Sequence, residues 1–243
     1  MHKQTLRAAV LTLLLAGGTF FVACGQQALA APSFDCSRAT AADEVAICSD
    51  PELSKLDSLI ADAYQTYQPD YQPKEEVGRL LLRDRASCGS DKLCIATAQW
   101  NALQTFGGDA PWAQAMAVDG IAKRAALASE DASAFSKEPP TKPAECRKTH
   151  MMDITTRFGN PLTPDNTDQG ISITYDNGSF VYSYERGHAF DGIISGQAAV
   201  LCLITVPYDC PAGDVRGRVY YTLNLATKRS WVSSDTEHGC GGA

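Results

Sequence analysis

Residues 36–57 read CSRATAADEVAICSDPELSKLD, and this stretch decides how the first half of the chain folds. Thr40 stands before two acidic residues, which is typical of an N-cap followed by the first turn of a helix. Ser49 and Asp50 then precede Pro51, which cannot continue that helix but suits the first turn of the next one. The stretch therefore predicts two consecutive helices with a capped restart between them.

Apolar residues at intervals of three and four extend this pattern beyond the restart. The helix that begins at the proline has its apolar face at Leu53, Leu56, Ile60 and Tyr64. After the short first helix, we expect helices over residues 51–67, 74–86 and 91–106. The region 34–106 is therefore predicted to be a helical domain.

The first 30 residues have the pattern of a secretory signal peptide. Lys3 and Arg7 precede a long apolar run, and a small-x-small cleavage site follows at 28–30. The sequence around Cys24 also resembles a lipoprotein cleavage box, so a lipid anchor at Cys24 is a second expectation. No other run approaches the length and apolarity needed to span a bilayer. We therefore expect a periplasmic or secreted protein.

The net charge of the chain limits the kinds of molecule that it is expected to bind. The formal net charge of the whole chain is −7, and removal of a leader that holds Lys3 and Arg7 but no acid changes it to −9. Such a protein is not expected to bind nucleic acid or an anionic membrane. A cationic protein partner would instead be attracted by the long-range field, mainly through faster association.

Nine cysteines occur in the chain, and eight remain if the leader is removed after residue 30. An even number in an exported chain favours disulfides over free thiols. The eight fall into two groups of four, which predicts two domains that are each stabilised by their own disulfides. The groups are Cys36, Cys48, Cys88 and Cys94, and then Cys146, Cys202, Cys210 and Cys240.

An antiparallel hairpin of the second and third helices would bring Cys88 and Cys94 towards Cys48. One of these two is then expected to bridge to Cys48 and the other to Cys36. Four cysteines allow three pairings, and the sequence does not choose among them.

Residues 107–145 are rich in Ala, Ser, Lys, Glu and Pro. This composition is typical of a linker, within which 112–128 has enough apolar residues to form a helix. The hydrophobic period then changes from helical spacing to alternation, so a separate β domain is expected over 146–243.

A tight-turn signal, Asp176-Asn177-Gly178, lies between two alternating stretches and predicts a β-hairpin. Further strands are expected over 151–158, 197–206, 216–225 and 230–233. Five or six strands would form an antiparallel sheet that closes into a small barrel or curls to protect its edges. The fold class is thus α+β. Within this domain we expect Cys202 to pair with Cys210, and Cys146 with Cys240.

Positions throughout the helical half follow one motif: Cys36, Glu44, Ile47, Cys48, Asp50, Pro51, Leu53, Leu56, Asp57, Leu82, Arg85, Cys88, Cys94 and Ile95. Together they resemble the N-terminal domain of the LprI-type lysozyme-inhibitor family, small helical modules of bacterial envelope proteins. The resemblance covers about residues 34–106. It ends where the family has Tyr and Arg and this chain has Gln99 and Ala102. The resemblance implies a module that binds or inhibits lysozyme.

The motif residues also have simpler interpretations. Glu44, Asp50 and Asp57 are typical of helix caps or solvated carboxylates. Arg85, like its neighbour Arg83, is expected either on a solvated face or paired with an acidic residue of the preceding helix, Asp57 or Asp62.

Catalytic and metal motifs are not evident in the sequence. His150, His188 and His238 follow the leader, and none lies in a hydrolase or metalloprotease frame. Ser183 and Asp191 lie near His188 in sequence, but we expect them to be solvated loop residues. The even cysteine count disfavours a metal site beside His238. We therefore expect neither enzymatic activity nor a cofactor.

Two functions remain as the main hypotheses, and a hydrolase is kept as a third only because two domains with a linker could frame a cleft. In the first, the helical domain of an exported envelope protein inhibits a cationic lysozyme by steric and electrostatic blocking. In the alternative, the protein is a non-catalytic envelope module whose β domain binds a glycan, peptide or protein through Tyr182, Tyr184, Tyr220 or Trp231. Aromatic residues at alternating positions are, however, more often part of a core.

Overall fold

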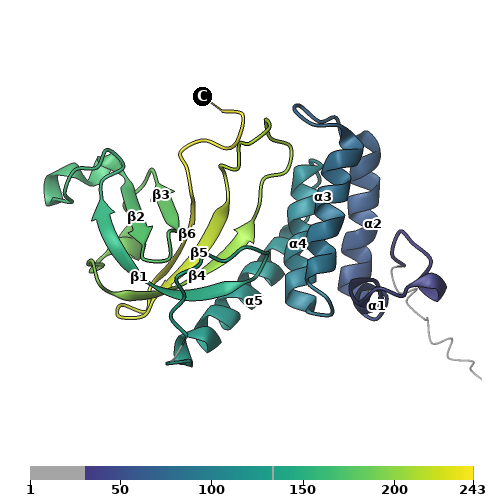
Figure 1. Cartoon of the computed structure of the whole chain (residues 1–243), viewed down its shortest axis with the longest axis horizontal. Helices are drawn as coiled ribbons and strands as arrows, with labels where there is room; N and C mark the ends of the chain where they lie inside the picture. Colours follow the sequence, from purple (N-terminus) through teal and green to yellow (C-terminus); the bar gives the residue numbers. More distant parts are fainter. Residues whose placement is uncertain (1–30, 133, 243) are drawn as a thin grey trace, which may run out of the picture.

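A computed structural model describes residues 31–132 and 134–242. Helices α2 to α4 stand side by side at one end, with α1 at the foot of α2; a closed barrel of six strands lies at the other end, and α5 runs between them (Figure 1). The α+β fold class with a C-terminal antiparallel barrel is thus confirmed. The expected signal peptide and the anchor at Cys24 lie outside the described residues.

The helical half begins with a short 3-10 turn and four helices. Their bounds are η1 (Cys36–Arg38), α1 (Ala42–Cys48), α2 (Pro51–Thr66), α3 (Lys74–Ser87) and α4 (Lys92–Thr105). Asp50 caps α2 as predicted, because its carboxylate accepts the N–H groups of Glu52 and Leu53 at 3.1 and 3.4 Å. Pro51 occupies the first turn, where the lack of an N–H group costs nothing.

Thr40 was predicted to be the N-cap of the first helix, and this prediction was wrong. The residue at the N-cap of α1 is Ala41, which has no side-chain acceptor. Glu44 instead reaches back from the first turn and accepts the backbone N–H groups of Thr40 and Ala41, each at 3.4 Å. Its carboxylate therefore lies at the positive end of α1, where a negative charge is favourable.

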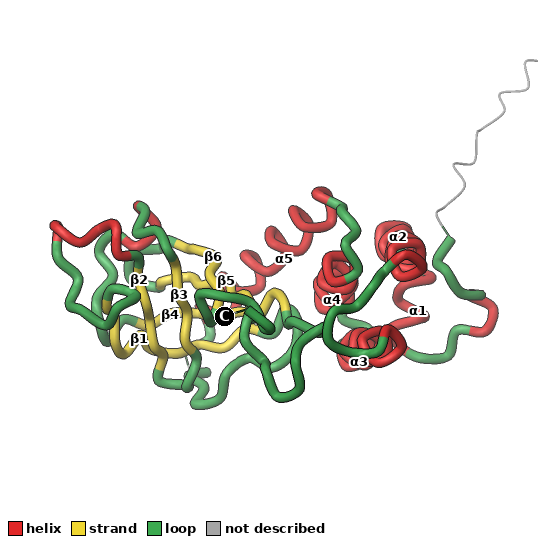
Figure 2. Tube along the Cα trace, turned by 90° about the horizontal axis from the view of Figure 1, so that it is seen from above, coloured by secondary structure: helices red, strands yellow, loops and turns green. Residues whose placement is uncertain are grey.

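Helix α4 is the centre of the bundle, and every residue from 94 to 103 is buried. Helices α2 and α3 were expected to pack on each other as a hairpin. They pack mainly against α4, which lies beside both of them (Figure 2). This arrangement leaves the outer faces of α2 and α3 separated by a groove.

All eight predicted cysteines are paired, each within its predicted group of four. The disulfides are Cys36–Cys48, Cys88–Cys94, Cys146–Cys202 and Cys210–Cys240. Multiple disulfides of this kind fit an extracytoplasmic protein.

The predicted pairings within each group were wrong. In the helical half, the turn between α3 and α4 brings Cys88 to a Cα distance of 5.4 Å from Cys94, so neither is available to Cys48. In the barrel, strand pairing places Cys146 directly opposite Cys202. Cys210 then bonds to Cys240, because the loop after β4 lies against the end of the chain. The disulfide partners are therefore decided by local turns and strand register, and not by a need to join the two ends of each domain.

The barrel has the strand order β1-β2-β3-β6-β5-β4. Its strands are β1 (Cys146–Thr155), β2 (Ile171–Tyr175), β3 (Phe180–Ser183), β4 (Ala198–Thr205), β5 (Val219–Asn224) and β6 (Ser230–Ser234). The predicted hairpin turn joins β2 to β3, with Gly178 at a φ of 79° that suits glycine. Strand β1 begins at Cys146, five residues earlier than expected.

The helix expected over 112–128 is present as α5 (Pro111–Glu130), but its packing corrects the interpretation of residues 107–145 as a linker. One side of α5 is fully buried and consists of Ala113, Ala117, Ile121 and Ala125. The three alanines of this side let α5 pack closely against α4 on one side and against β1, β4 and β5 on the other. Val200 and Ile204 of β4 belong to the same core as the bundle. The helical and β halves therefore share a hydrophobic core.

A second contact between the halves joins the α2–α3 loop to the β4–β5 loop. The Asp209 carboxylate accepts the N–H groups of Asp70, Tyr71 and Gln72 at 2.6, 2.9 and 3.0 Å. The Gln72 amide donates to the carbonyls on either side of Asp209 at 2.7 and 2.9 Å. Burial raises the pKa of Asp209, but these backbone donors outweigh it and hold the pKa below its ordinary value.

Acid should weaken this contact. Because the folded-state pKa of Asp209 is lower than the unfolded value of about 4, its stabilisation is present above that pH and is lost as the pH falls through the folded value. Asp209→Asn should reduce the pH dependence of the urea midpoint across the acidic range. Asp119→Asn is the control, since Asp119 is exposed and pairs with Lys123 along α5. An equal pH dependence in both variants would contradict the assignment.

Candidate functional site

The groove between α2 and α3 has a volume of about 520 Å³ and an apolar floor. Ala98 and Ala102 of α4, with Phe106 directly after it, form this floor, while Ile60 of α2 and Leu82 of α3 lie on the two walls. Leu82 is 55% exposed, so this wall presents a large apolar side chain to solvent. The groove is thus an open apolar channel on the outer side of the bundle.

One end of the groove is closed by aromatic packing. The ring of Tyr64 meets that of Phe106 edge to face, with the ring centroids 5.0 Å apart. Gly78 of α3 permits this, because a Cβ atom there would lie 3.2 Å from the Tyr64 ring. The sequence therefore closes the groove at this end with a glycine opposite a tyrosine.

The other end of the groove holds a buried ion-pair network. Arg85 donates from Nε to Asp43 at 2.8 Å and from Nη1 to Asp57 at 3.1 Å. The second carboxylate oxygen of Asp57 accepts the backbone N–H and the hydroxyl of Ser33, at 2.8 and 2.6 Å. Asp43 and Asp57 are 3% and 5% exposed, so their charges depend on Arg85 and on these donors for compensation.

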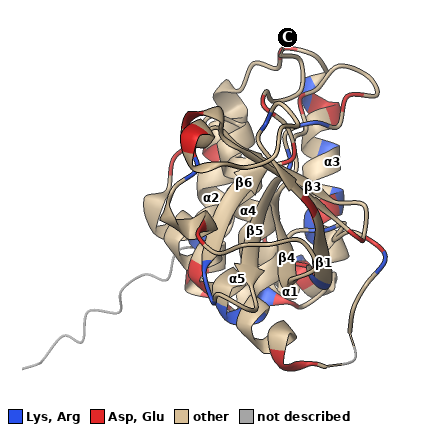
Figure 3. Cartoon of the chain, turned by 90° about the vertical axis from the view of Figure 1, so that its left-hand side faces the viewer, with Lys and Arg blue, Asp and Glu red and all other residues tan. Residues whose placement is uncertain are grey.

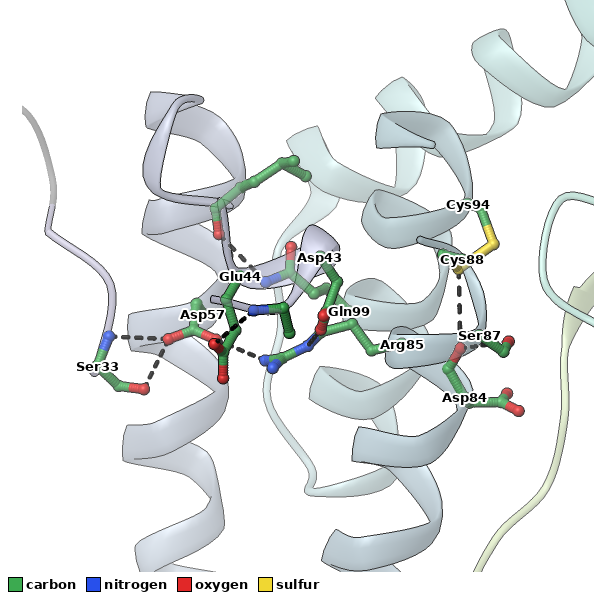
Figure 4. Close-up of polar contacts among 12 residues, drawn as sticks. Ser33, Asp43, Glu44, Asp57, Asp84, Arg85, Ser87, Cys88, Cys94 and Gln99 are labelled. Atoms are coloured by element: carbon green, nitrogen blue, oxygen red, sulfur yellow. Dashed lines mark hydrogen bonds and ion pairs between the residues drawn. A yellow bond between two sulfur atoms is a disulfide. The ribbon is translucent and has the colours of Figure 1, made fainter. Parts of the chain in front are cut away.

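Gln99 of α4 completes this end of the groove and is 1% exposed. Its Nε2 donates to the Leu53 carbonyl at 3.3 Å, and its Oε1 has no hydrogen-bond partner in the part of the chain that the structure describes. Figure 4 shows Glu44, Asp57, Arg85 and Gln99 gathered between the helices. Each of α1, α2, α3 and α4 therefore contributes one polar side chain to the same end of the groove.

The charges at this end do not cancel. Within the described residues, Arg85 is the cation paired with the carboxylates of Asp43 and Asp57, and Glu44 adds a third carboxylate at the half-buried edge. The four side chains have a formal net charge of −2, which favours a cation at this end of the groove. No group of three or more His, Cys, Asp or Glu within the described residues is arranged to hold a metal ion.

Apart from its four cysteines and two isoleucines, the motif has eight residues, and the structure divides these into two sets. Glu44, Asp57, Leu82 and Arg85 line the groove. The other four are structural: Asp50 and Pro51 start α2, and Leu53 and Leu56 are core residues with 2% and 0% exposure.

The expected pairing of Arg85 with Asp57 is confirmed, whereas a solvated Asp57 was wrong, since the carboxylate is buried. Sequence reasoning missed the roles of Asp43 and Gln99. The available signal for Gln99 was a long amide inside the most apolar helix.

The aromatic residues of the barrel differ in exposure. Tyr182, Tyr220 and Trp231 are buried at 6%, 4% and 6%, while Tyr184 is 49% exposed. The Arg157 guanidinium lies 5.0 Å from the centroid of the Tyr184 ring. It also lies 4.4 Å from the ring of Phe158, which is 60% exposed. Only one of the four suggested aromatics therefore remains accessible.

Ser183, His188 and Asp191 do not form a nucleophile and base pair. The His188 ring contacts Asp191 at 3.0 Å, and both side chains are exposed. The Ser183 hydroxyl donates to the Glu185 carbonyl instead of facing His188. Cys240, next to which a metal site was considered, is bonded to another cysteine.

Comparisons with known proteins add no family. No family model matches the chain, and neither a curated protein nor a solved structure shows significant similarity to it. Among the described residues, none of the helices has the length and apolarity of a membrane span.

Proposed function

We propose that this is an exported bacterial envelope protein whose helical half binds and inhibits a cationic lysozyme by steric and electrostatic blocking, without chemistry of its own. The observation that carries the proposal is the convergence of Glu44, Asp57, Leu82 and Arg85 on one open groove. These four positions come from three helices and share the motif that resembles lysozyme inhibitors. Core packing alone does not require an exposed leucine and a half-buried carboxylate on the same groove.

The distribution of charge supports this partner. Residues 31–110 contain thirteen acidic and seven basic residues, a formal net charge of −6, while the remainder after them has a net charge of −3. Figure 3 shows the barrel strands largely without charged residues, which lie mostly on loops and helices. The attraction for a cationic protein is therefore greater around the helical half. The proposed location is the periplasm or the exterior, and a lipid anchor at Cys24 remains a prediction.

Lysozyme activity titrated with the purified protein tests this proposal. We expect inhibition that weakens as salt is raised, because salt screens the long-range attraction. Leu82→Arg should weaken inhibition about tenfold, or about 1.4 kcal/mol, since it places a bulky cation in the apolar wall. Leu127→Arg is the matched control, because Leu127 is 69% exposed on α5 and does not line the groove. No inhibition at a large molar excess in low salt would refute the proposal.

A second candidate is a binding module that uses the barrel. The observation that favours it is the exposed pair of Tyr184 and Phe158, whose rings both lie near the Arg157 guanidinium. Deletion of the barrel would not separate the two candidates, because α5 and the bundle share a core with β4. The lysozyme titration separates them, because the second candidate predicts no inhibition, whereas under the first proposal Tyr184→Ala in the full chain should leave inhibition unchanged.

A further inference from the structure

We propose that the Glu44 end of the groove is a pocket for one basic side chain, an arginine or a lysine, that the protein partner inserts. This inference rests on the proposed function in taking the occupant from a cationic protein, and it adds the group that is recognised. Three observations carry it: an unpartnered acceptor, an excess of carboxylates and an apolar approach to both.

The unpartnered acceptor is Oε1 of Gln99. A buried amide oxygen without a donor costs stability, and native proteins rarely keep one without a functional or structural reason. Gln99 lines the groove from its floor and lies next to Arg85 in Figure 4. This oxygen is itself buried, so an occupant reaches it only by displacing the side chains that cover it, and must then offer an N–H or O–H donor.

The excess of carboxylates specifies a charged donor. Both oxygens of Asp57 are already engaged, one by Arg85 and the other by Ser33. Glu44 is less committed, because its hydrogen bonds to the backbone are both 3.4 Å long. A guanidinium or ammonium group would form a shorter, charge-assisted bond with Glu44 and reduce the net charge of −2 at this end. An anion would meet uncompensated carboxylates, and a purely apolar group would leave Gln99 unsatisfied.

The apolar walls fit the rest of such a side chain. Phe34 and Ile60 line the groove beside the polar end, and Leu82 lies on the opposite wall. Arginine and lysine have aliphatic stems that pack on apolar surface while the charged end reaches polar groups. One basic side chain therefore satisfies the walls and the polar end together.

Peptides test this inference without lysozyme. The probes are short capped peptides with a central arginine, lysine or citrulline between apolar residues, citrulline being the neutral analogue of arginine. Binding to the isotope-labelled full chain is followed by NMR through the side-chain signals of Gln99 and Arg85. We expect saturable shifts with arginine or lysine, and affinity at least about tenfold lower with citrulline. Equal affinity for arginine and citrulline peptides would overturn the inference.

Two variants assign the pocket. Glu44→Gln should weaken binding of the arginine peptide about tenfold by removing the negative charge of this weakly bonded carboxylate. Gln99→Leu should weaken binding while lowering the urea midpoint only slightly, because it removes one long hydrogen bond, from Nε2 to the Leu53 carbonyl at 3.3 Å, together with the unpartnered Oε1. A purely structural Gln99 would show the opposite result, with lower stability and unchanged binding.

The outcome is independent of lysozyme itself. Binding of the arginine peptide without lysozyme inhibition would keep the pocket and replace the partner. If both variants still inhibit lysozyme and no peptide binds, the pocket is refuted while the proposed inhibition of lysozyme stands.

Discussion

Arg85→Met should lower the free energy of unfolding by about 3–5 kcal/mol, one of the two largest effects that we expect in this protein. Arg85 is the cation between the buried carboxylates of Asp43 and Asp57, and its side chain is only 14% exposed. Methionine preserves much of the side-chain volume but leaves two like charges without compensation in a poorly solvated site. The cost arises mainly from these stranded carboxylates, and less from the loss of the ion pairs themselves.

Urea unfolding of the variant measures this effect, with Arg79→Met as the matched control. Arg79 lies on the same helix and pairs with Glu76, but both side chains are well exposed, at 60% and 46%. Exposed pairs contribute about 0–1 kcal/mol, so the control should be nearly as stable as the native protein. If Arg85→Met and Arg79→Met lost equal free energy of unfolding, the ion pairs of Arg85 with Asp43 and Asp57 would not behave as buried ones.

Loss of the Cys146–Cys202 disulfide should destabilise the protein by about 4 kcal/mol, against about 2 kcal/mol for loss of Cys88–Cys94. The difference follows from loop size, because the first bond joins residues 56 positions apart and the second joins residues six apart. A longer closed loop removes more conformational freedom from the unfolded chain. Cys202 also belongs to the core shared by the bundle and the barrel, so its replacement removes packing as well.

Paired Cys→Ala variants of each disulfide, unfolded with urea, measure the two effects. Replacing both partners avoids leaving a free thiol that could react with another cysteine. A loss for Cys88–Cys94 as large as that for Cys146–Cys202 would contradict the explanation based on loop size.

Local elements were the most predictable part of this fold. Asp50 and Pro51 act at the start of α2 as the sequence indicated, because a cap and a first turn involve only adjacent residues. The hairpin turn at 176–178 was predictable for the same reason. Thr40 failed as a cap because Glu44 supplies the acceptor at that helix start, a choice between two local solutions.

Half of the candidate site was also within reach of the sequence. The pairing of Arg85 with Asp57 could be expected, but the burial of this pair, with Asp43 as a second partner, could not. In the sequence, Gln99 was notable only as a position that differs from the motif of the LprI-type family. Its unpartnered oxygen exists because α4 lies between α2 and α3, and this packing involves residues more than 40 positions apart.

The sequence by itself determined the succession of helices and strands, the α+β class and the division of the cysteines into two groups. These features depend on capping, turn residues and the period of apolar side chains, all of which act over a few residues. Only the tertiary structure decided the disulfide partners, the role of α5 and the groove. The physical reason is that each of these depends on which surfaces bury one another across the chain. The small face of α5 joins the two halves because a bundle and a barrel both cover it.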